Sequence, residues 1–216
     1  AGLLRAAVPQ EREDARILKQ ELQCNAVRTS HYPQSQHFID ACDRLGLLVF
    51  TEMPGWRYIG DESWKAQALQ NCREMVCQCR NHPSIFLWGA RVNGSADDEA
   101  FYKRTNEAIH RLDPTRPTAG ARNHRKSQLL EDVYAYNDYS YRGRGAACEA
   151  RAAVTSDPRK GYLISEFGGQ QFPAKTFDDE PHRLAQALHH AAVLNDAIAQ
   201  PGVAGSFGWC MTDYNT

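Results

Sequence analysis

The sequence has no apolar run that approaches the ~20 residues of a membrane-spanning helix. Residues 1–20 are rich in Arg and Glu and lack the apolar centre of a signal peptide. The formal net charge is only -1, so the chain has no field that would gather nucleic acid or an anionic membrane. We therefore expect a soluble, untargeted protein with neither nucleic acid nor membrane as a partner.

Cysteine is present without the spacing of a disulfide scaffold. The seven cysteines are an odd number in a chain of 216 residues, which favours a reducing compartment and predicts a cytoplasmic location. Cys72, Cys77, Cys79 and His82 form the one group that resembles a metal site. This group lacks a CxxC pair, and Cys77 and Cys79 would face different sides of a helix. We predict neither a metal nor a cofactor.

Internal repeats and long low-complexity linkers are also absent, and the chain is 42% hydrophobic and 24% charged, which predicts one globular domain over residues 1–216. Helical and strand patterns alternate along it, and several strand patterns are apolar on both faces. This alternation predicts an α/β fold with about seven parallel, covered strands. The expected helices are 10–23, 36–45, 61–80, 97–112 and 181–199. The expected strands are 25–30, 47–51, 85–88, 117–121, 133–140, 162–166 and 203–211.

A carboxylate stands at the end of the strand predicted over 162–166. The run is apolar or β-prone, ends on Glu166, and is followed by Gly168 and Gly169. In an α/β barrel, catalytic groups collect at the C-terminal ends of the strands, so Glu166 is a candidate nucleophile or base. The alternative is a surface Glu that only ends the strand.

Five segments together resemble one family of enzymes. They are NAVRTSHYP (25–33), DACDRLGLLVFTE (40–52), RNHPSI (80–85), LDPTRP (112–117) and SEFG (165–168). They resemble the barrel domain of family-2 glycoside hydrolases, the group of β-galactosidases, β-glucuronidases and β-mannosidases, along nearly the whole chain. The resemblance implies a (β/α)8 TIM barrel that is incomplete here, because its first strand and the preceding β-sandwich domains are missing.

The resemblance also implies the reaction. Retaining glycosidases use two carboxyl groups ~5–5.5 Å apart, one as nucleophile and one as proton donor. Glu166 matches the family's nucleophile, but the Asn-Glu that supplies the acid reads Asn93-Gly94 here. Gly94 cannot donate a proton, and positioned proton transfer is worth ~10²–10⁴ in rate, so we expect weak or altered activity. Three explanations for the glycine at position 94 are an engineered knockout of the acid, a natural pseudoenzyme and a barrel repurposed for other chemistry.

Nearby acids offer a poor replacement for the missing proton donor. Asp97, Asp98 and Glu99 follow Gly94 closely, but they begin the next predicted helix, where acids commonly cap. The magnesium-dependent members of the family rely partly on the acid missing at position 94. This departure agrees with the prediction of no metal.

The resemblance assigns substrate contacts to six further positions: Arg28, His31, Asn93, Asn137, Tyr139 and Trp209. It implies that Arg28 holds the nucleophile, that His31 and Asn93 bind sugar hydroxyls, and that Trp209 stacks on the sugar. Tyr139 would contact the nucleophile beside Asn137, with Tyr136 or Tyr141 as alternatives. Glu52 is either a third pocket carboxylate or the partner of an Arg or His, and Trp56 and Trp88 are expected in a loop or the core.

Two other functions stay open. Ser30 beside His31, or Ser95 beside Gly94, would suit an esterase, although no Gly-x-Ser-x-Gly elbow is present. A carbohydrate-binding or structural barrel would keep Arg28, Asn93 and Trp209 without catalysis. The sequence does not distinguish which sugar is bound.

The strand count predicts association. Seven strands leave two sheet edges, 25–30 and 203–211, and such edges pair readily with other chains. We expect a homo-oligomer, or a rearranged terminal segment within residues 1–10, to cover the opening. Residues 2–8 are apolar enough for us to predict that they pair as a strand.

Overall fold

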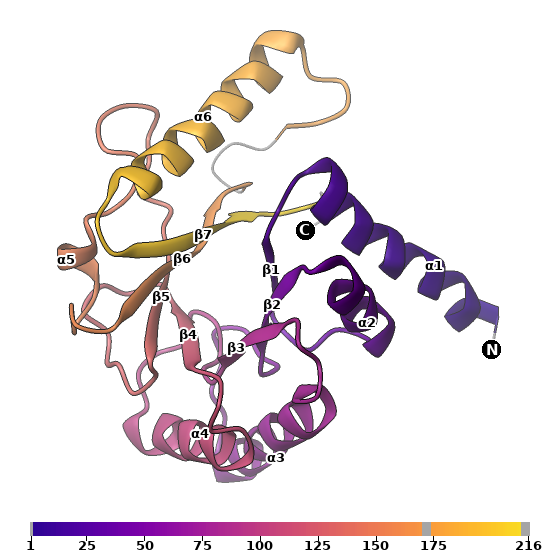
Figure 1. The fold of residues 1–216 in the computed structure, drawn as a ribbon. Coiled ribbons are helices and arrows are strands. Elements are labelled where there is room, and N and C mark those ends of the chain that lie inside the picture. The colour runs from indigo at the N-terminus through magenta and orange to yellow at the C-terminus, as the bar shows by residue number, and fades with distance from the viewer. Residues whose placement is uncertain (1, 170–173, 213–216) are drawn as a thin grey trace. The chain divides into compact units, whose positions relative to one another are not determined.

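The computed structural model describes residues 2–169 and 174–212, with side chains from residue 9 onward. Its strands are β1 (Ala26–Thr29), β2 (Leu48–Glu52), β3 (Ile85–Gly89), β4 (Thr118–Arg122), β5 (Val133–Asn137), β6 (Gly161–Gly168) and β7 (Val203–Trp209). Its helices are α1 (Gly2–Arg16), α2 (Gln36–Leu45), α3 (Glu62–Cys79), α4 (Glu99–Leu112), α5 (Arg151–Val154) and α6 (Glu180–Ala199), with a π-helical turn, η1 (Ile17–Glu21), after α1. These elements alternate along the chain (Figure 1).

The chain folds into two compact units. The N-terminal unit comprises residues 1–120 and 130–132, and the C-terminal unit comprises residues 121–129 and 133–216. The prediction of a single domain over 1–216 stays a prediction. Among the described helices, none combines the length and the apolar character needed to cross a bilayer.

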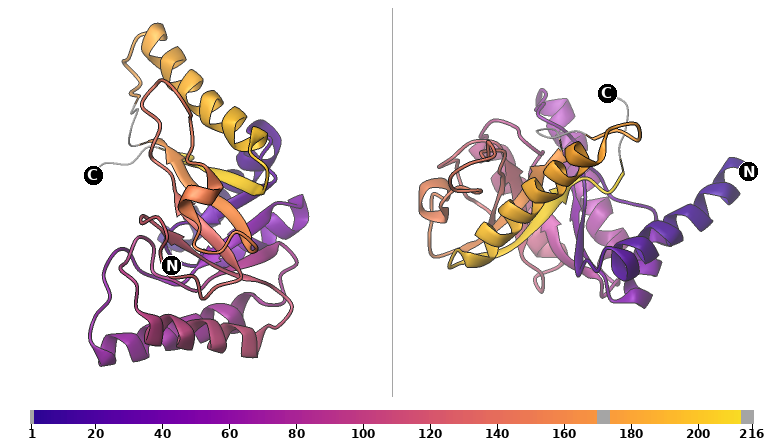
Figure 2. Two further views of the ribbon diagram at one scale, coloured as in Figure 1. Left: turned by 90° about the vertical axis from the view of Figure 1, so that its left-hand side faces the viewer. Right: turned by 90° about the horizontal axis from the view of Figure 1, so that it is seen from above.

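The N-terminal unit contains β1, β2, β3 and the start of β4 in parallel register. Arg28 of β1 pairs with Phe50 of β2, and Glu52 at the end of β2 pairs with Gly89 of β3. Helices α3 and α4 lie side by side (Figures 1 and 2). The hydrophobic core of this unit includes the buried side chains of Val49, Met53, Ile85, Trp88, Phe101 and Ile109.

Local sequence signals fix the helix ends in this unit. Ser35, Asp61 and Asp98 each accept a hydrogen bond from the backbone N–H three residues onward, which caps α2, α3 and α4. Gly46 ends α2 with a φ of 66°, a left-handed conformation that glycine adopts without a steric penalty. These caps place the following strands, and therefore their C-terminal ends, at defined positions.

The C-terminal unit contains β5, β6 and β7, also parallel, and α6 packs along β6 and β7 (Figure 2). Its core includes Tyr134, Tyr162, Ile164, Phe167 and Val193. The register of β5 against β6 shifts between Tyr136 and Asn137, which brings Asn137 opposite Glu166. An irregularity of this kind re-aims side chains at a strand end.

The structure corrects one expectation and adds one helix. Residues 2–8 belong to helix α1 and not to a strand, because Leu, Ala and Arg are strong helix formers and apolar content alone does not distinguish the two states. The short helix α5 is not among the helices expected from the sequence. Predicted strands 133–140 and 203–211 end earlier, at Asn137 and Trp209.

Candidate active site

A buried ion pair joins the ends of β1 and β2. The guanidinium of Arg28 donates from Nε to Glu52 Oε1 at 2.7 Å and from Nη2 to Oε2 at 3.0 Å. Both side chains are about 2% exposed. Burial alone would raise the pKa of Glu52, but the Arg28 charge and a hydrogen bond with His31 outweigh it and hold this pKa below its ordinary value. Glu52 is therefore an ionised partner of Arg28.

His31 and Asn93 complete this cluster. His31 Nδ1 lies 3.3 Å from Glu52 Oε2, and the amide of Asn93 contributes Nδ2 at 3.5 Å from His31 Nε2. Asn93 Oδ1 accepts from Arg28 Nη2 at 3.2 Å. Arg28 Nη2 also lies 3.3 Å from His31 Nδ1, so the His31 ring contacts all three of the other side chains. Three residues that the resemblance assigned to substrate binding therefore lie together with Glu52.

Gly89 makes room for this cluster. A Cβ built on Gly89 would lie 2.7 Å from Glu52 Cα and 2.8 Å from its Cγ. Only glycine allows β2 and β3 to approach so closely at this point. A glycine inside a strand is the sequence signal for such an approach, and Gly89 directly follows the predicted strand 85–88.

Gly94 follows Asn93 in a left-handed conformation, with a φ of 64°. Of the acids nearby, Asp98 caps α4 and pairs with Lys65 at 2.8 Å, while Asp97 pairs with Arg91 at 2.5 Å. These contacts agree with the helix-start role expected for the acids. They give no support to Asp97 or Asp98 as a substitute proton donor.

The C-terminal unit presents the second carboxylate. Glu166 is 6% exposed near the end of β6, and Tyr139 donates from its hydroxyl to Glu166 Oε2 at 3.0 Å. Neighbouring Asn137 accepts from Ser165 Oγ at 2.8 Å and donates to Asn123 Oδ1 at 2.9 Å. Tyr139 therefore contacts Glu166 in the structure, while the role of either residue toward a substrate stays a prediction. The roles of Asn123 and Ser165 were not foreseen, because nothing local in the sequence marks them.

Other aromatic residues occupy different places. Tyr136 is buried in the core of the C-terminal unit, and Tyr141 packs against His189 with ring centroids 4.8 Å apart. Trp209 ends β7 in register with Gly168. Trp88 is fully buried, as expected, whereas Trp56 lies in the loop after β2 and is 59% exposed.

The serines offered for an esterase lack the required geometry where the structure shows their partners. Ser95 is 1% exposed, and its hydroxyl lies 2.5 Å from the hydroxyl of Tyr102. The His31 ring is occupied by Glu52, Arg28 and Asn93. No observation in the described residues favours a serine nucleophile.

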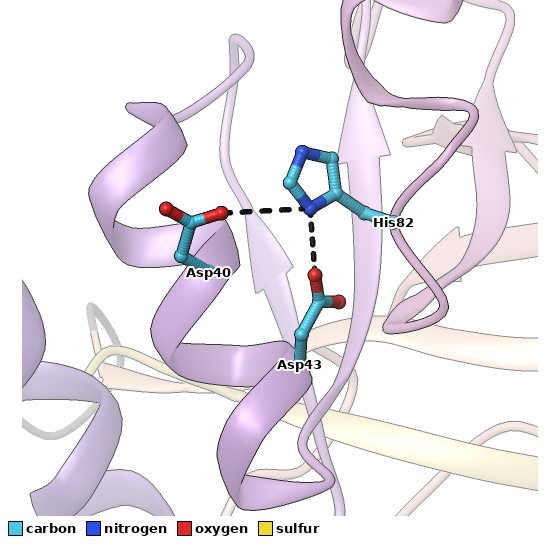
Figure 3. A group of neighbouring side chains, drawn as sticks. All are labelled: Asp40, Asp43 and His82. Carbon is cyan, nitrogen blue, oxygen red and sulfur yellow. Dashed lines mark hydrogen bonds and ion pairs between the residues drawn. The ribbon is translucent and has the colours of Figure 1, made fainter.

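His82 lies beside two aspartates of α2 (Figure 3). Its Nδ1 lies 2.6 Å from Asp43 Oδ2 and 3.9 Å from Asp40 Oδ1, while its Nε2 lies 2.9 Å from Gln36 Oε1. Asp43 also accepts the backbone N–H of Ser84 at 2.9 Å. Both ring nitrogens face protein acceptors, so the cluster fastens α2 to the start of β3. His82 and Ser84 of the RNHPSI segment therefore have a structural role, because they connect α2 to β3.

A sequence model described as "Glycosyl hydrolases family 2, TIM barrel domain" matches residues 7–201. The chain belongs to this family. It is 48% identical over 207 residues to a β-galactosidase of Thermoanaerobacterium thermosulfurigenes, covering 95% of the chain and 29% of that relative. It is 31% identical over 233 residues to a β-glucuronidase of Bacteroides fragilis, covering 95% and 33%. The chain thus spans about three tenths of the length of these curated relatives.

Solved structures show the same fold. A GH2 β-galacturonidase from Eisenbergiella tayi bound to galacturonate superposes with a TM-score of 0.77 at 25% identity, covering 94% of this chain and 40% of that one. The predicted fold class, an incomplete TIM barrel with seven parallel strands, is confirmed. The expected salt bridge between Arg28 and Glu166 stays a prediction, as do the assigned roles of the family-2 site residues.

Proposed function

We propose that this chain is part of the catalytic barrel of a retaining β-glycosidase, with Glu166 as the nucleophile. The observation that carries the proposal is a buried carboxylate near the C-terminal end of β6 that accepts a hydrogen bond from Tyr139 at 3.0 Å. The names of the relatives, β-galactosidase and β-glucuronidase, support β-glycosides as the substrate class. Catalytic groups of TIM-barrel enzymes lie at the C-terminal ends of the strands, which also supports the assignment.

The proposed reaction has two steps. A Glu166 oxygen attacks the anomeric carbon as the bond to the leaving oxygen breaks, and water then displaces Glu166 from the glycosyl-enzyme. We assign His31 and Asn93 to sugar hydroxyls, Asn137 and Tyr139 to the support of Glu166, and Trp209 to stacking. Arg28 and Glu52 position His31 and Asn93 through the contacts described above.

The residue at position 94 limits the proposed activity. Without a side chain, Gly94 transfers no proton, so glycosides with poor leaving groups should turn over roughly 10²–10⁴-fold more slowly than with the acid in place. Leaving groups that depart as stable anions need no protonation. An activated aryl glycoside is therefore the substrate on which the remaining machinery can be measured.

Azide provides the test. With an activated aryl β-galactoside or β-glucuronide, Glu166 would displace the phenolate and azide would then displace Glu166, which yields a glycosyl azide and restores the carboxylate. We expect NMR to identify a β-glycosyl azide, the product of two displacements, with the unaltered chain, whereas Glu166→Ala should yield no β-azide because a single direct displacement by azide inverts the anomeric carbon. Equal yields from both chains would contradict the assignment of Glu166.

We also propose that the chain self-associates in a reducing compartment such as the cytoplasm. All seven cysteines are free thiols, which supports such a compartment. Self-association is supported by a row of exposed apolar side chains on α6, at Leu184, Leu188, Leu194 and Ile198.

A further inference from the structure

The loop of residues 53–60, which follows β2, is fastened to the cluster around Arg28. Gly55 donates its N–H to the carbonyl of His31 at 3.2 Å, and Arg57 donates to the carbonyl of Asn93 at 2.8 Å. Trp56 and Asn93 form an isolated parallel β-bridge. The two backbones are therefore about 4.8 Å apart, one strand spacing. Residues paired across a bridge carry their side chains on the same face.

The side chain of Trp56 remains open although its backbone is held. Trp56 is 59% exposed, while Asn93 across the bridge is 2% exposed and turned toward Arg28 and His31. The Arg57 guanidinium carbon lies 4.9 Å from the centre of the Trp56 ring, a cation–π contact. An indole held at its backbone and open at its ring differs from the buried aromatic side chains of the core.

The backbone around Trp56 is strained. Arg57 has a φ of 59°, a left-handed conformation that is uncommon outside glycine and concentrates at functional sites. Gly55 has a φ of 142°, and a Cβ there would lie 3.1 Å from Val92 Cγ1. This loop conformation is therefore set by specific residues, and it holds Trp56 beside Asn93.

We propose that Trp56 is the stacking platform for the second sugar, or other aglycone, of a β-linked substrate. The inference rests on the proposed function. A sugar ring has an apolar C–H face that stacks on an indole, and the Arg57 guanidinium next to it offers donors for hydroxyl or carboxylate oxygens. Because Trp56 lies across the bridge from Asn93, it contacts the part of the substrate beyond the sugar that Asn93 binds. The substrate class is β-linked disaccharides and glycosides with a ring-shaped aglycone.

Binding, measured without turnover, tests the inference in a chain that lacks the acid at position 94. Isothermal titration would use a methyl β-glycoside and a β-linked disaccharide, each with galactose or glucuronic acid as the first sugar. The variants are Trp56→Ala, Trp56→Phe and the control Tyr58→Ala, whose side chain lies in the same loop and is 64% exposed. Circular dichroism would confirm that each variant is folded.

We expect Trp56→Ala to weaken disaccharide binding about 3- to 10-fold, the loss that corresponds to one aromatic stacking contact. Binding of the methyl glycoside should not change, Trp56→Phe should retain most of the affinity, and Tyr58→Ala should behave as the unaltered chain. Equal disaccharide affinity with and without Trp56 would overturn the platform, as would an equal loss for both ligands. If neither ligand bound any variant, the proposed function would fail first, and the platform with it.

Discussion

At the scale of single residues, the proposed activity makes its sharpest prediction at position 94. Introducing Gly94→Glu supplies a carboxylic acid next to Asn93, and turnover of an unactivated β-glycoside should rise by at least ~10²-fold. The gain is limited by the backbone, because a φ of 64° disfavours any side chain by roughly 1–2 kcal/mol unless the turn relaxes. Steady-state kinetics with alkyl and activated aryl glycosides would measure the change, which should be largest for the alkyl substrate.

Gly94→Gln is the matched control for this experiment. Gln has the same size and backbone preference as Glu but donates no proton in acid catalysis. Activity that rose equally in Gly94→Gln and Gly94→Glu would contradict the acid role and point to loop stabilisation. Activity that rose in neither would favour a binding barrel without catalysis.

The lowered pKa of Glu52 predicts how the stability of the chain depends on pH. Its pKa is lower in the folded chain than in the unfolded chain, so its contribution to stability is present above pH ~4.3 and is lost as the pH falls through the folded pKa. In Glu52→Gln the buried Arg28 loses its counter-charge, and at pH 7 we expect unfolding to require roughly 3 kcal/mol less. Urea unfolding should show the gap between the two chains narrowing below pH ~4. A gap that stayed constant down to pH 3 would contradict the ion pair's role.

At the scale of elements, the approach of β2 to β3 depends on Gly89. Gly89→Ala would push a methyl group to 2.7 Å from Glu52 Cα, which is backbone and cannot move aside cheaply. We expect a loss of about 1–3 kcal/mol in unfolding free energy, together with weaker sugar binding, because Glu52 shifts away from Arg28. Urea unfolding and titration with a methyl β-glycoside would measure the two effects.

Gly205→Ala is the control, because it changes another strand glycine whose added Cβ would meet only Leu163 Cδ2 at an ordinary 3.5 Å. This variant should keep both stability and binding. If Gly89→Ala were as stable as Gly205→Ala and bound sugar equally well, the prediction that stability and binding depend on the close approach of β2 to β3 would be wrong.

The elements also show which parts of the structure can be predicted from sequence. Helix α2 begins and ends as expected because Ser35 caps it and Gly46 ends it, and both are local signals. The pairing of Arg28 with Glu52 joins strands 24 residues apart, so periodicity could not decide between the two roles considered for Glu52. Family resemblance selected Asn93 and Tyr139, whereas Gly89 and Trp56 gain meaning only once the strands are in register.

Helix α6 likewise has the length predicted from the sequence, but the apolar character of its exposed side was not predicted. His189, Val193 and Ala197 are buried at spacings of four residues, and the opposite side carries Leu184, Leu188, Leu194 and Ile198 with exposures of 54%, 60%, 40% and 82%. A helix that is apolar on two sides is normally covered on both. Periodicity alone does not tell which of the two sides faces the sheet.

At the scale of the whole molecule, the exposed row on α6 suits a second copy of the same helix. Leu184 and Ile198 lie seven residues on either side of Ala191, and Leu188 and Leu194 lie three. In an antiparallel pair about a two-fold axis, Leu184 would meet Ile198 of the other copy, and the two Ala191 residues would mark the crossing. Asp196 is the one Asp, Glu, Lys or Arg between Leu184 and Ile198, and its carboxylate accepts the N–H groups of Ala147 and Cys148.

The size of this row sets the strength of the predicted dimer. Four large side chains on a stripe ~21 Å long bury less than the ~1,200 Å² of a standard specific interface, so association should be weak, near micromolar or above. Leu188→Glu places a charge at the centre of the stripe and should abolish the dimer in sedimentation equilibrium. Gln78→Glu adds the same charge at an exposed site on α3 and should leave it intact. A monomer at ~100 µM, or a dimer that survives Leu188→Glu, would contradict the predicted contact and indicate that another segment covers the stripe.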